Sequence, residues 1–148
     1  VSDPGYKLVR ECIASEIEVD SLPGATAILP ALTLSGLPPD KFFFLGYLPE
    51  KEGKRVEMLK NLNTIYKILN TTYLIYIAPH KLLRTLEDMQ TIFGDIEITL
   101  AHELTKLHQE VKSKKISEWI TKLNPPTGKP KGEYVLLFRL SSTPGVEG

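Results

Sequence analysis

Residues 71–94 read T-T-Y-L-I-Y-I-A-P-H-K-L-L-R-T-L-E-D-M-Q-T-I-F-G, and this stretch decides the fold. Its β-branched and aromatic beginning, closed by Ala78-Pro79, predicts a strand over residues 71–77. Apolar side chains then recur at helical spacing, at Leu82, Leu83, Leu86, Met89 and Phe93. With Gly94 as a stop signal, they predict an amphipathic helix over residues 80–93.

The same alternation of strand and helix continues on both sides of this unit. Helices are predicted over residues 6–15, 26–36, 54–69 and 116–123, the last with Trp119 facing inward. Thr26 is expected to cap the second of these helices and Gly36 to end it. Strands are predicted over residues 17–22, 41–48, 96–101, 109–112 and 132–140, with 41–48 as a buried strand. The fold class is therefore α/β, with a mixed sheet flanked by helices.

Leu37-Pro38-Pro39-Asp40 is hinge-like and marks a candidate domain boundary. We expect residues 1–36 to end one domain, residues 37–140 to form an α/β domain and residues 141–148 to be a tail. The first residues, V-S-D-P-G-Y, contain no initiator Met and no signal-peptide pattern. We therefore expect the first residue of this chain to lie in the middle of a longer protein.

Composition restricts the function only weakly. The 148 residues carry a formal net charge of zero, so RNA binding has to rest on local patches such as Lys112, Lys114 and Lys115. Such a run is more often a solvated face. Cys12 is the only cysteine, which fits a reducing cytoplasm. No apolar run reaches the roughly 18 residues of a membrane span.

Three stretches carry candidate chemistry. S-L-P-G-A-T-A, residues 21–27, opens a helix that could hold an anion or be an ordinary turn. A-P-H-K-L, residues 78–82, follows a strand, where His80 is either a ligand contact or a cap. Residues 101–110 gather Glu103, Lys106 and two histidines, as a substrate-facing site or as a solvated loop. No spacing typical of a metal-ligand set is present.

In their order, these motifs resemble the tetrapyrrole-methylase superfamily, and within it the bacterial small-subunit ribosomal RNA cytidine 2′-O-methyltransferases. The resemblance covers nearly the whole chain. It runs through S-D-P-G-Y-K-L-V (2–9), residues 21–49, G-K-R (53–55), A-P-H-K-L-L (78–83), E-L-T-K-L-H-Q-E (103–110) and K-G-E-Y-V-L-L (131–137).

The resemblance implies two α/β domains with S-adenosylmethionine bound in the cleft between them. It also implies a cytoplasmic homodimer, without a membrane partner, that methylates a cytidine ribose in small-subunit ribosomal RNA or in the assembled subunit. By position, the cofactor would contact Asp3, Pro4, Gly5, Pro23, Gly24, Thr26, Leu48, Pro49, Ala78, Pro79 and His80. Glu103 is the candidate base and Lys106 the candidate stabiliser of the forming alkoxide, with His80 or His108 as the alternative base.

The chain departs from the family pattern at two positions. Leu45 and Ile77 stand where the family usually has Glu. Two other interpretations stay open, and the departure favours the first of them. One is a non-catalytic fragment that dimerises or docks on RNA. The other is a methylase for a small molecule of the tetrapyrrole type, against which the E-L-T-K-L-H stretch argues.

Overall fold

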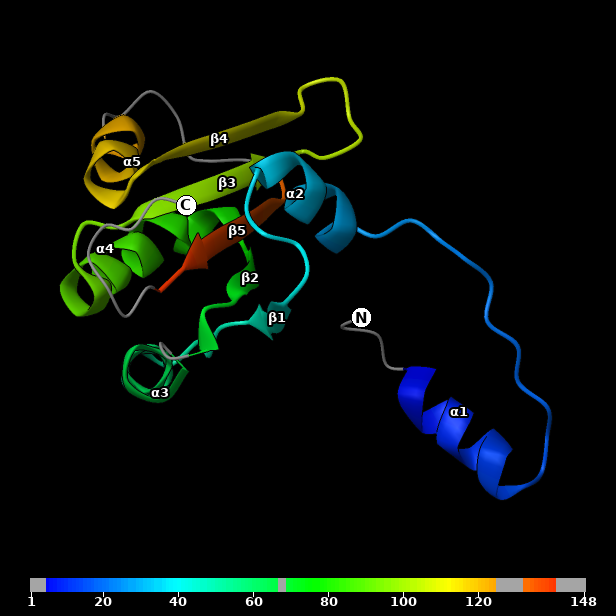
Figure 1. Ribbon diagram of the computed structural model, residues 1–148. Coiled ribbons are helices and arrows are strands. Elements are labelled where there is room, and N and C mark those ends of the chain that lie inside the picture. Colours follow the sequence, from blue (N-terminus) through cyan, green and yellow to red (C-terminus); the bar gives the residue numbers. More distant parts are fainter. Residues whose placement is uncertain (1–4, 67–68, 125–131, 141–148) are drawn as a thin grey trace.

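A computed structural model describes residues 5–66, 69–124 and 132–140 of the chain. Its centre is a five-stranded sheet in the order β1-β2-β5-β3-β4 (Figure 1). The strands are β1 (Phe42–Tyr47), β2 (Thr72–Ile77), β3 (Glu97–His102), β4 (Glu110–Lys115) and β5 (Tyr134–Arg139). β1 and β2 pair in parallel, whereas β5 is antiparallel to both β2 and β3, and β4 is antiparallel to β3. The mixed α/β sheet is therefore confirmed.

The insertion of β5 between β2 and β3 gathers five chain segments at one end of the sheet. Tyr134 begins β5 and pairs with Ile77 on one side and His102 on the other. His102 in turn pairs with Glu110, the first residue of β4. The carboxyl ends of β1, β2 and β3 therefore lie beside the beginnings of β4 and β5.

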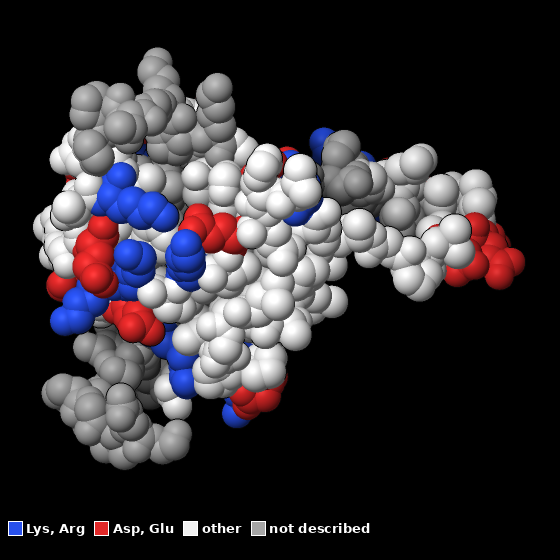
Figure 2. Space-filling model, turned by 90° about the horizontal axis from the view of Figure 1, so that it is seen from above, with Lys and Arg blue, Asp and Glu red and all other residues white. Residues whose placement is uncertain are grey.

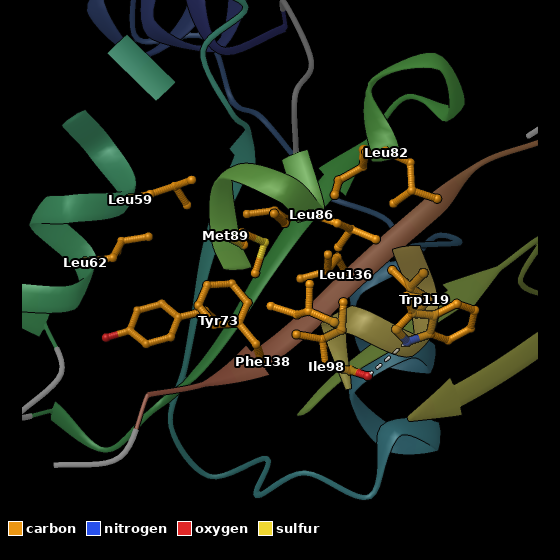
Figure 3. Close-up of a cluster of buried hydrophobic side chains, with 14 of the residues drawn as sticks. Leu59, Leu62, Tyr73, Leu82, Leu86, Met89, Ile98, Trp119, Leu136 and Phe138 are labelled. Carbon is orange, nitrogen blue, oxygen red and sulfur yellow. Dashed lines mark hydrogen bonds between the residues drawn. The ribbon is translucent and has the colours of Figure 1, made fainter. Parts of the chain in front are cut away.

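The two faces of the sheet carry separate apolar clusters. The helices are α1 (Gly5–Ala14), α2 (Ile28–Ser35), α3 (Glu52–Asn61), α4 (Leu82–Phe93) and α5 (Ile116–Leu123). On one face, α3, α4 and α5 pack Leu59, Leu86 and Trp119 toward Tyr73 and Phe138 (Figure 3). On the other face, α2 packs Ile28, Ala31 and Leu32 against Leu74, Ala101, Val135 and Leu137. Burial of apolar area holds both layers together.

Helix α1 stands apart from the sheet (Figure 1). None of its residues is buried, and Tyr6, Leu8 and Ile13 are largely exposed. The segment from Ile17 to Ala27 that joins α1 to α2 has no regular strand or helix. The expected domain boundary at residues 37–40 stays a prediction.

Most of the expected elements are confirmed. The strand at 71–77 and the helix at 80–93 correspond to β2 and α4, with a 3₁₀ turn over Pro79–Lys81 ahead of α4. Helix α5 has the predicted bounds, and Trp119 is buried. Gly36 ends α2 in the left-handed conformation, as its sequence position indicates. Among the described residues, no helix is both long and apolar enough to cross a membrane.

Four expectations about elements are wrong. Residues 17–22 form no strand, because no neighbouring strand pairs with their backbone. The strand at 41–48 is an edge strand, and Phe42, Phe43 and Tyr47 are exposed rather than buried. The helix expected over 54–69 ends at Asn61 and passes into a π-helical turn over Leu62–Tyr66. Thr26 is not the N-cap of α2: that position is Ala27, although Thr26 Oγ1 accepts a 3.3 Å hydrogen bond from the Ile28 N–H.

Candidate functional site

A cavity of about 330 Å³ lies at the end of the sheet where the carboxyl ends of β1 and β2 meet the beginning of β5. Its walls come from the start of α2, the strand ends and the segment before β5: Ala27, Tyr47, Tyr76, Ile77, Ala78, Pro79, Gly132, Glu133, Tyr134 and Val135. β2 ends at Ile77, and Pro79, two residues later, has no backbone N–H with which the strand pairing could continue. The volume falls in the range of small-molecule sites.

Two tyrosines form the aromatic part of the cavity wall. Tyr47 and Tyr76 are register partners on β1 and β2, and their ring centroids are 5.5 Å apart with an interplanar angle of 57°. Phe44 packs edge-on against Tyr76 at 4.9 Å, and Thr26 makes a side-chain hydrogen bond to Tyr76. Burial and the neighbouring Tyr47 raise the pKa of Tyr76, so its phenol stays protonated at neutral pH. Tyr76 is thus a fixed, neutral aromatic wall.

A polar network joins the loop after β3 to the segment before β5. The Glu103 N–H donates to the Glu133 carbonyl at 3.1 Å, and the Glu133 N–H donates to Glu103 Oε1 at 2.9 Å. Lys106 Nζ lies 3.1 Å from Glu103 Oε1 and 3.4 Å from Glu133 Oε2. The close approach depends on Gly132, where an added Cβ would come within 2.4 Å of Glu103 Oε1. The network places Lys106 next to a cavity-lining residue.

Hydrogen bonding sets the charge of this network. The Glu133 N–H is the largest cause that lowers the pKa of Glu103, and Lys106 is the next. The Glu103 side chain, in turn, is the largest cause that raises the pKa of Lys106. Both groups therefore stay charged at neutral pH. A carboxylate with a lowered pKa is a weak base, so in this geometry Glu103 is well suited to hold Lys106 in place.

A second, smaller cavity of about 30 Å³ lies on the other side of the same strand ends, and Arg55 and Thr85 help to line it. Arg55 is only 6% exposed. Its Nε donates to Asp88 Oδ2 at 2.7 Å and its Nη1 donates to the Glu50 carbonyl at 3.1 Å. Among the described residues, no hydrogen-bond partner reaches Arg55 Nη2. One donor of this buried guanidinium therefore has no acceptor within the part of the chain that the structure describes.

The structure brings together only part of the predicted cofactor set. Ala78 and Pro79 line the large cavity. Leu48 and Pro49 line the small one, together with Ala78. His80 is exposed and is not among the lining residues of either cavity.

The other predicted cofactor residues lie around or away from the large cavity. Thr26 is not among the cavity-lining residues, but its side chain makes a hydrogen bond to Tyr76, which is. Pro23 and Gly24 are exposed on the segment before α2, and Gly5 begins α1. Asp3 and Pro4 lie outside the described residues. The alternative base His108 is exposed in the loop between β3 and β4.

Sequence reasoning missed Tyr47, Tyr76, Gly132 and Glu133. The available signals were the aromatic residues at two strand ends and a Gly-Glu pair directly before the last strand. The two positions that depart from the family pattern both join the core facing α3 and α4. There Ile77 is 5% exposed and Leu45 is partly buried.

The predicted basic run lies on β4 and is interrupted by acidic neighbours. Lys112 pairs with Glu110, and Lys122 of α5 approaches the same carboxylate at 3.8 Å. Lys114 and Lys122 lie 5.9 and 5.1 Å from the centroid of the Trp119 ring. Figure 2 shows basic and acidic side chains interspersed over this view of the molecule. Among the described residues, no group of three His, Cys, Asp or Glu side chains is placed to hold a metal ion.

Comparison with known proteins gives a family for this geometry. Residues 1–119 match the model of the Tetrapyrrole (Corrin/Porphyrin) Methylases. The chain belongs to the tetrapyrrole methylase family. It is 42% identical over 138 residues to ribosomal RNA small subunit methyltransferase I of Thermotoga maritima, which covers 93% of this chain and 59% of the relative. It is 38% identical to the protein of the same name from Vibrio cholerae, over 93% of this chain and 46% of the relative.

The chain thus spans about half of the length of these two relatives. Solved structures agree on the fold. The methyltransferase CobJ matches with a TM-score of 0.63 at 19% identity, over 99% of this chain and 63% of that chain. A putative diphthine synthase from Entamoeba histolytica matches with a TM-score of 0.68 at 15% identity, over 96% of this chain and 61% of that chain.

Proposed function

We propose that this chain is part of a methyltransferase that uses S-adenosylmethionine to methylate the 2′-hydroxyl of a cytidine in small-subunit ribosomal RNA. The observation that carries the proposal is the large cavity. It is built from the same strand ends and turn that the family resemblance singled out, in a chain 42% identical to a ribosomal RNA small subunit methyltransferase I. We place the protein in the cytoplasm as a homodimer that acts on the RNA or the assembled subunit.

The residues present fit the methyl donor. S-adenosylmethionine supplies an activated methyl group on a sulfonium. The cavity offers an aromatic wall at Tyr47 and Tyr76, a carboxylate at Glu133 and the small residues Ala27 and Ala78. Ala78 and Pro79 would line the donor directly. Thr26 would act through Tyr76, while Leu48 and Pro49 would support the strand end.

The chain's own residues have a limited task in this reaction. They align donor and acceptor, exclude water and stabilise the charge that develops on the ribose oxygen. Lys106 is the proposed stabiliser of that charge, held by Glu103 and Glu133. We propose that Glu103 also accepts the hydroxyl proton: its lowered pKa makes it a weak base, but the carboxylate is ionised and can take the proton as the bond to the methyl group forms. A group that is ionised throughout the neutral range makes the rate independent of pH between about 6 and 8.

Chemical mapping of the methylated position tests the proposal. The chain is incubated with methyl-labelled S-adenosylmethionine and either small subunits or naked small-subunit RNA, and the RNA is then hydrolysed in alkali. A 2′-O-methyl group removes the hydroxyl that attacks the phosphodiester, so one alkali-resistant linkage 3′ of a cytidine is the expected result. Label in a base, or label in a tetrapyrrole added as a competing acceptor and none in RNA, would contradict it.

A further inference from the structure

Tyr47, Tyr76 and Glu133 converge on one side of the large cavity. The two rings form a tilted corner, with centroids 5.5 Å apart. Glu133 directly precedes β5, whose first residue is the register partner of Ile77, the neighbour of Tyr76. Both Tyr47 and Glu133 act electrostatically on Tyr76, which agrees with their closeness. Three chain segments therefore contribute two aromatic residues and Glu133 to the lining of the same cavity.

This wall has the chemistry of a site for an organic cation. The face of an aromatic ring carries partial negative charge and attracts sulfonium and quaternary ammonium groups. Thr26 and Phe44 contact the Tyr76 ring, whereas Tyr47 is 61% exposed, so a ligand in the cavity can reach its ring face. Lys106 approaches the Glu133 carboxylate only at 3.4 Å, and the Glu133 side chain is 87% exposed. An ion pair this exposed is weak and leaves the carboxylate able to attract a second cation.

We propose that Tyr47, Tyr76 and Glu133 recognise the positive charge of the sulfonium and thereby distinguish the methyl donor from its product. This inference rests on the function proposed above. During transfer, the ribose oxygen forms a bond to the methyl carbon, its proton passes to Glu103 and the carbon–sulfur bond breaks. The sulfur keeps the electron pair, and the sulfonium becomes a neutral thioether. The attraction to the rings and the carboxylate is then lost, which favours release of S-adenosylhomocysteine.

Calorimetric titration of the chain with S-adenosylmethionine and S-adenosylhomocysteine separates charge recognition from shape. Tyr47→Leu should weaken the sulfonium ligand about fivefold and the thioether less than twofold, because only the cation–π attraction is removed. Glu133→Gln should act in the same direction. Tyr47→Phe keeps the π-face and should restore most of the preference. Phe42→Leu changes an exposed aromatic residue at the far end of the same strand and should leave both affinities unchanged.

The outcomes separate this inference from the proposed function. Equal losses for both ligands in Tyr47→Leu would mean that the ring is only an apolar wall, and the charge-recognition site would be wrong while the donor site stood. If wild-type protein binds neither ligand, both proposals fail together. Circular dichroism melts of each variant establish that the exposed substitutions leave the fold intact.

Discussion

The two faces of the sheet are covered to very different degrees. On one face, α3, α4 and α5 enclose a cluster that contains fifteen buried apolar residues within the described part of the chain. On the other, α2 is the helix that packs against the sheet among the described residues, and its cluster has seven buried members. The large cavity lies at the end of this second face, where α2 begins and Tyr76 reaches the surface.

This difference separates the residues that mainly stabilise the fold from those that are placed to bind a ligand. A fully enclosed face gives rigid strand ends, and rigid strand ends hold side chains such as Tyr47 and Tyr76 in fixed positions. A partly covered face leaves room for a ligand at those ends. We therefore expect substitutions on the enclosed face to change mainly stability, and substitutions around the cavity to change mainly binding.

The largest expected effect is on the enclosed face. Leu86 of α4 is fully buried, and Leu86→Ala should lower the free energy of unfolding by about 4 kcal/mol, because a cavity remains in a closely packed cluster. Leu32→Ala on α2 should cost about 2 kcal/mol, since its smaller cluster can close more easily. Urea denaturation measures both values, with exposed Leu29→Ala as the control on α2. Equal losses on the two faces would remove the distinction.

The next effect concerns position 77, where the resemblance to the family implies a Glu in place of Ile77. Ile77 and Arg55 line the same small cavity, and Arg55 Nη2 has no hydrogen-bond partner among the described residues. Ile77→Glu should cost about 2 kcal/mol with Arg55 present and about 4 kcal/mol beside Arg55→Met, because an unpaired buried charge is destabilising. A double-mutant cycle by urea denaturation gives the coupling. Additive losses would show that the two positions do not interact.

A smaller loss of stability is expected from substitution of Gly132, which allows Glu103 and Glu133 to approach each other. Gly132 has a φ of +82°, and its added Cβ would also approach His102 Nε2 to 2.7 Å. Gly132→Ala should therefore cost about 2 kcal/mol and weaken donor binding by displacing Glu133. Gly53 in α3 has open space around it, so Gly53→Ala should be neutral or slightly stabilising. Thermal melts and calorimetry provide both readouts, and an unchanged Gly132→Ala protein would contradict the close packing.

The smallest expected effect is a decrease of the melting temperature at low pH. A hydrogen bond from the Glu133 backbone N–H is the leading cause that lowers the pKa of Glu103. A hydrogen bond from the Lys112 side chain is the leading cause that lowers the pKa of Glu110. A carboxyl group whose pKa is lower in the folded state contributes stability above its unfolded pKa and loses it as pH falls through the folded value. The melting temperature should therefore be steady from about pH 7 to 5 and fall below about pH 4.5.

Glu103→Gln should flatten part of that decline, whereas substitution of the exposed Glu57 should not. Melts recorded across the pH range test this directly. An identical decline in wild-type protein and Glu103→Gln would exclude the Glu103 network as a source of the acid sensitivity.

The sequence predicted local elements well where one periodicity dominated. The β2–α4 unit and α5 follow directly from β-branched runs and helical spacing. The strand expected at 17–22 failed because alternation alone does not supply a pairing partner. The exposure of β1 depends on the strand order, and no local pattern reports that β1 lies at the edge.

The site was also predictable only in part, because local sequence patterns do not report which strands pair. Ala78-Pro79 could be placed at a strand end from its own sequence. The contribution of Gly132 and Glu133 depends on β5 entering the sheet between β2 and β3, a pairing across more than fifty residues. Lys106 could be singled out by its chemistry, but its contact with Glu133 follows from the pairing of β5 with β3, in which His102 is the partner of Tyr134.

Amide chemical-shift mapping of the isotopically labelled chain tests most directly the claim that the methyl donor binds at the open end of the partly covered face. On titration with S-adenosylmethionine, we predict the largest shifts at Tyr47, Ala78 and Glu133, with Glu118 and Thr121 of α5 unchanged. Shifts confined to α5, or no shifts at millimolar donor, would contradict the account.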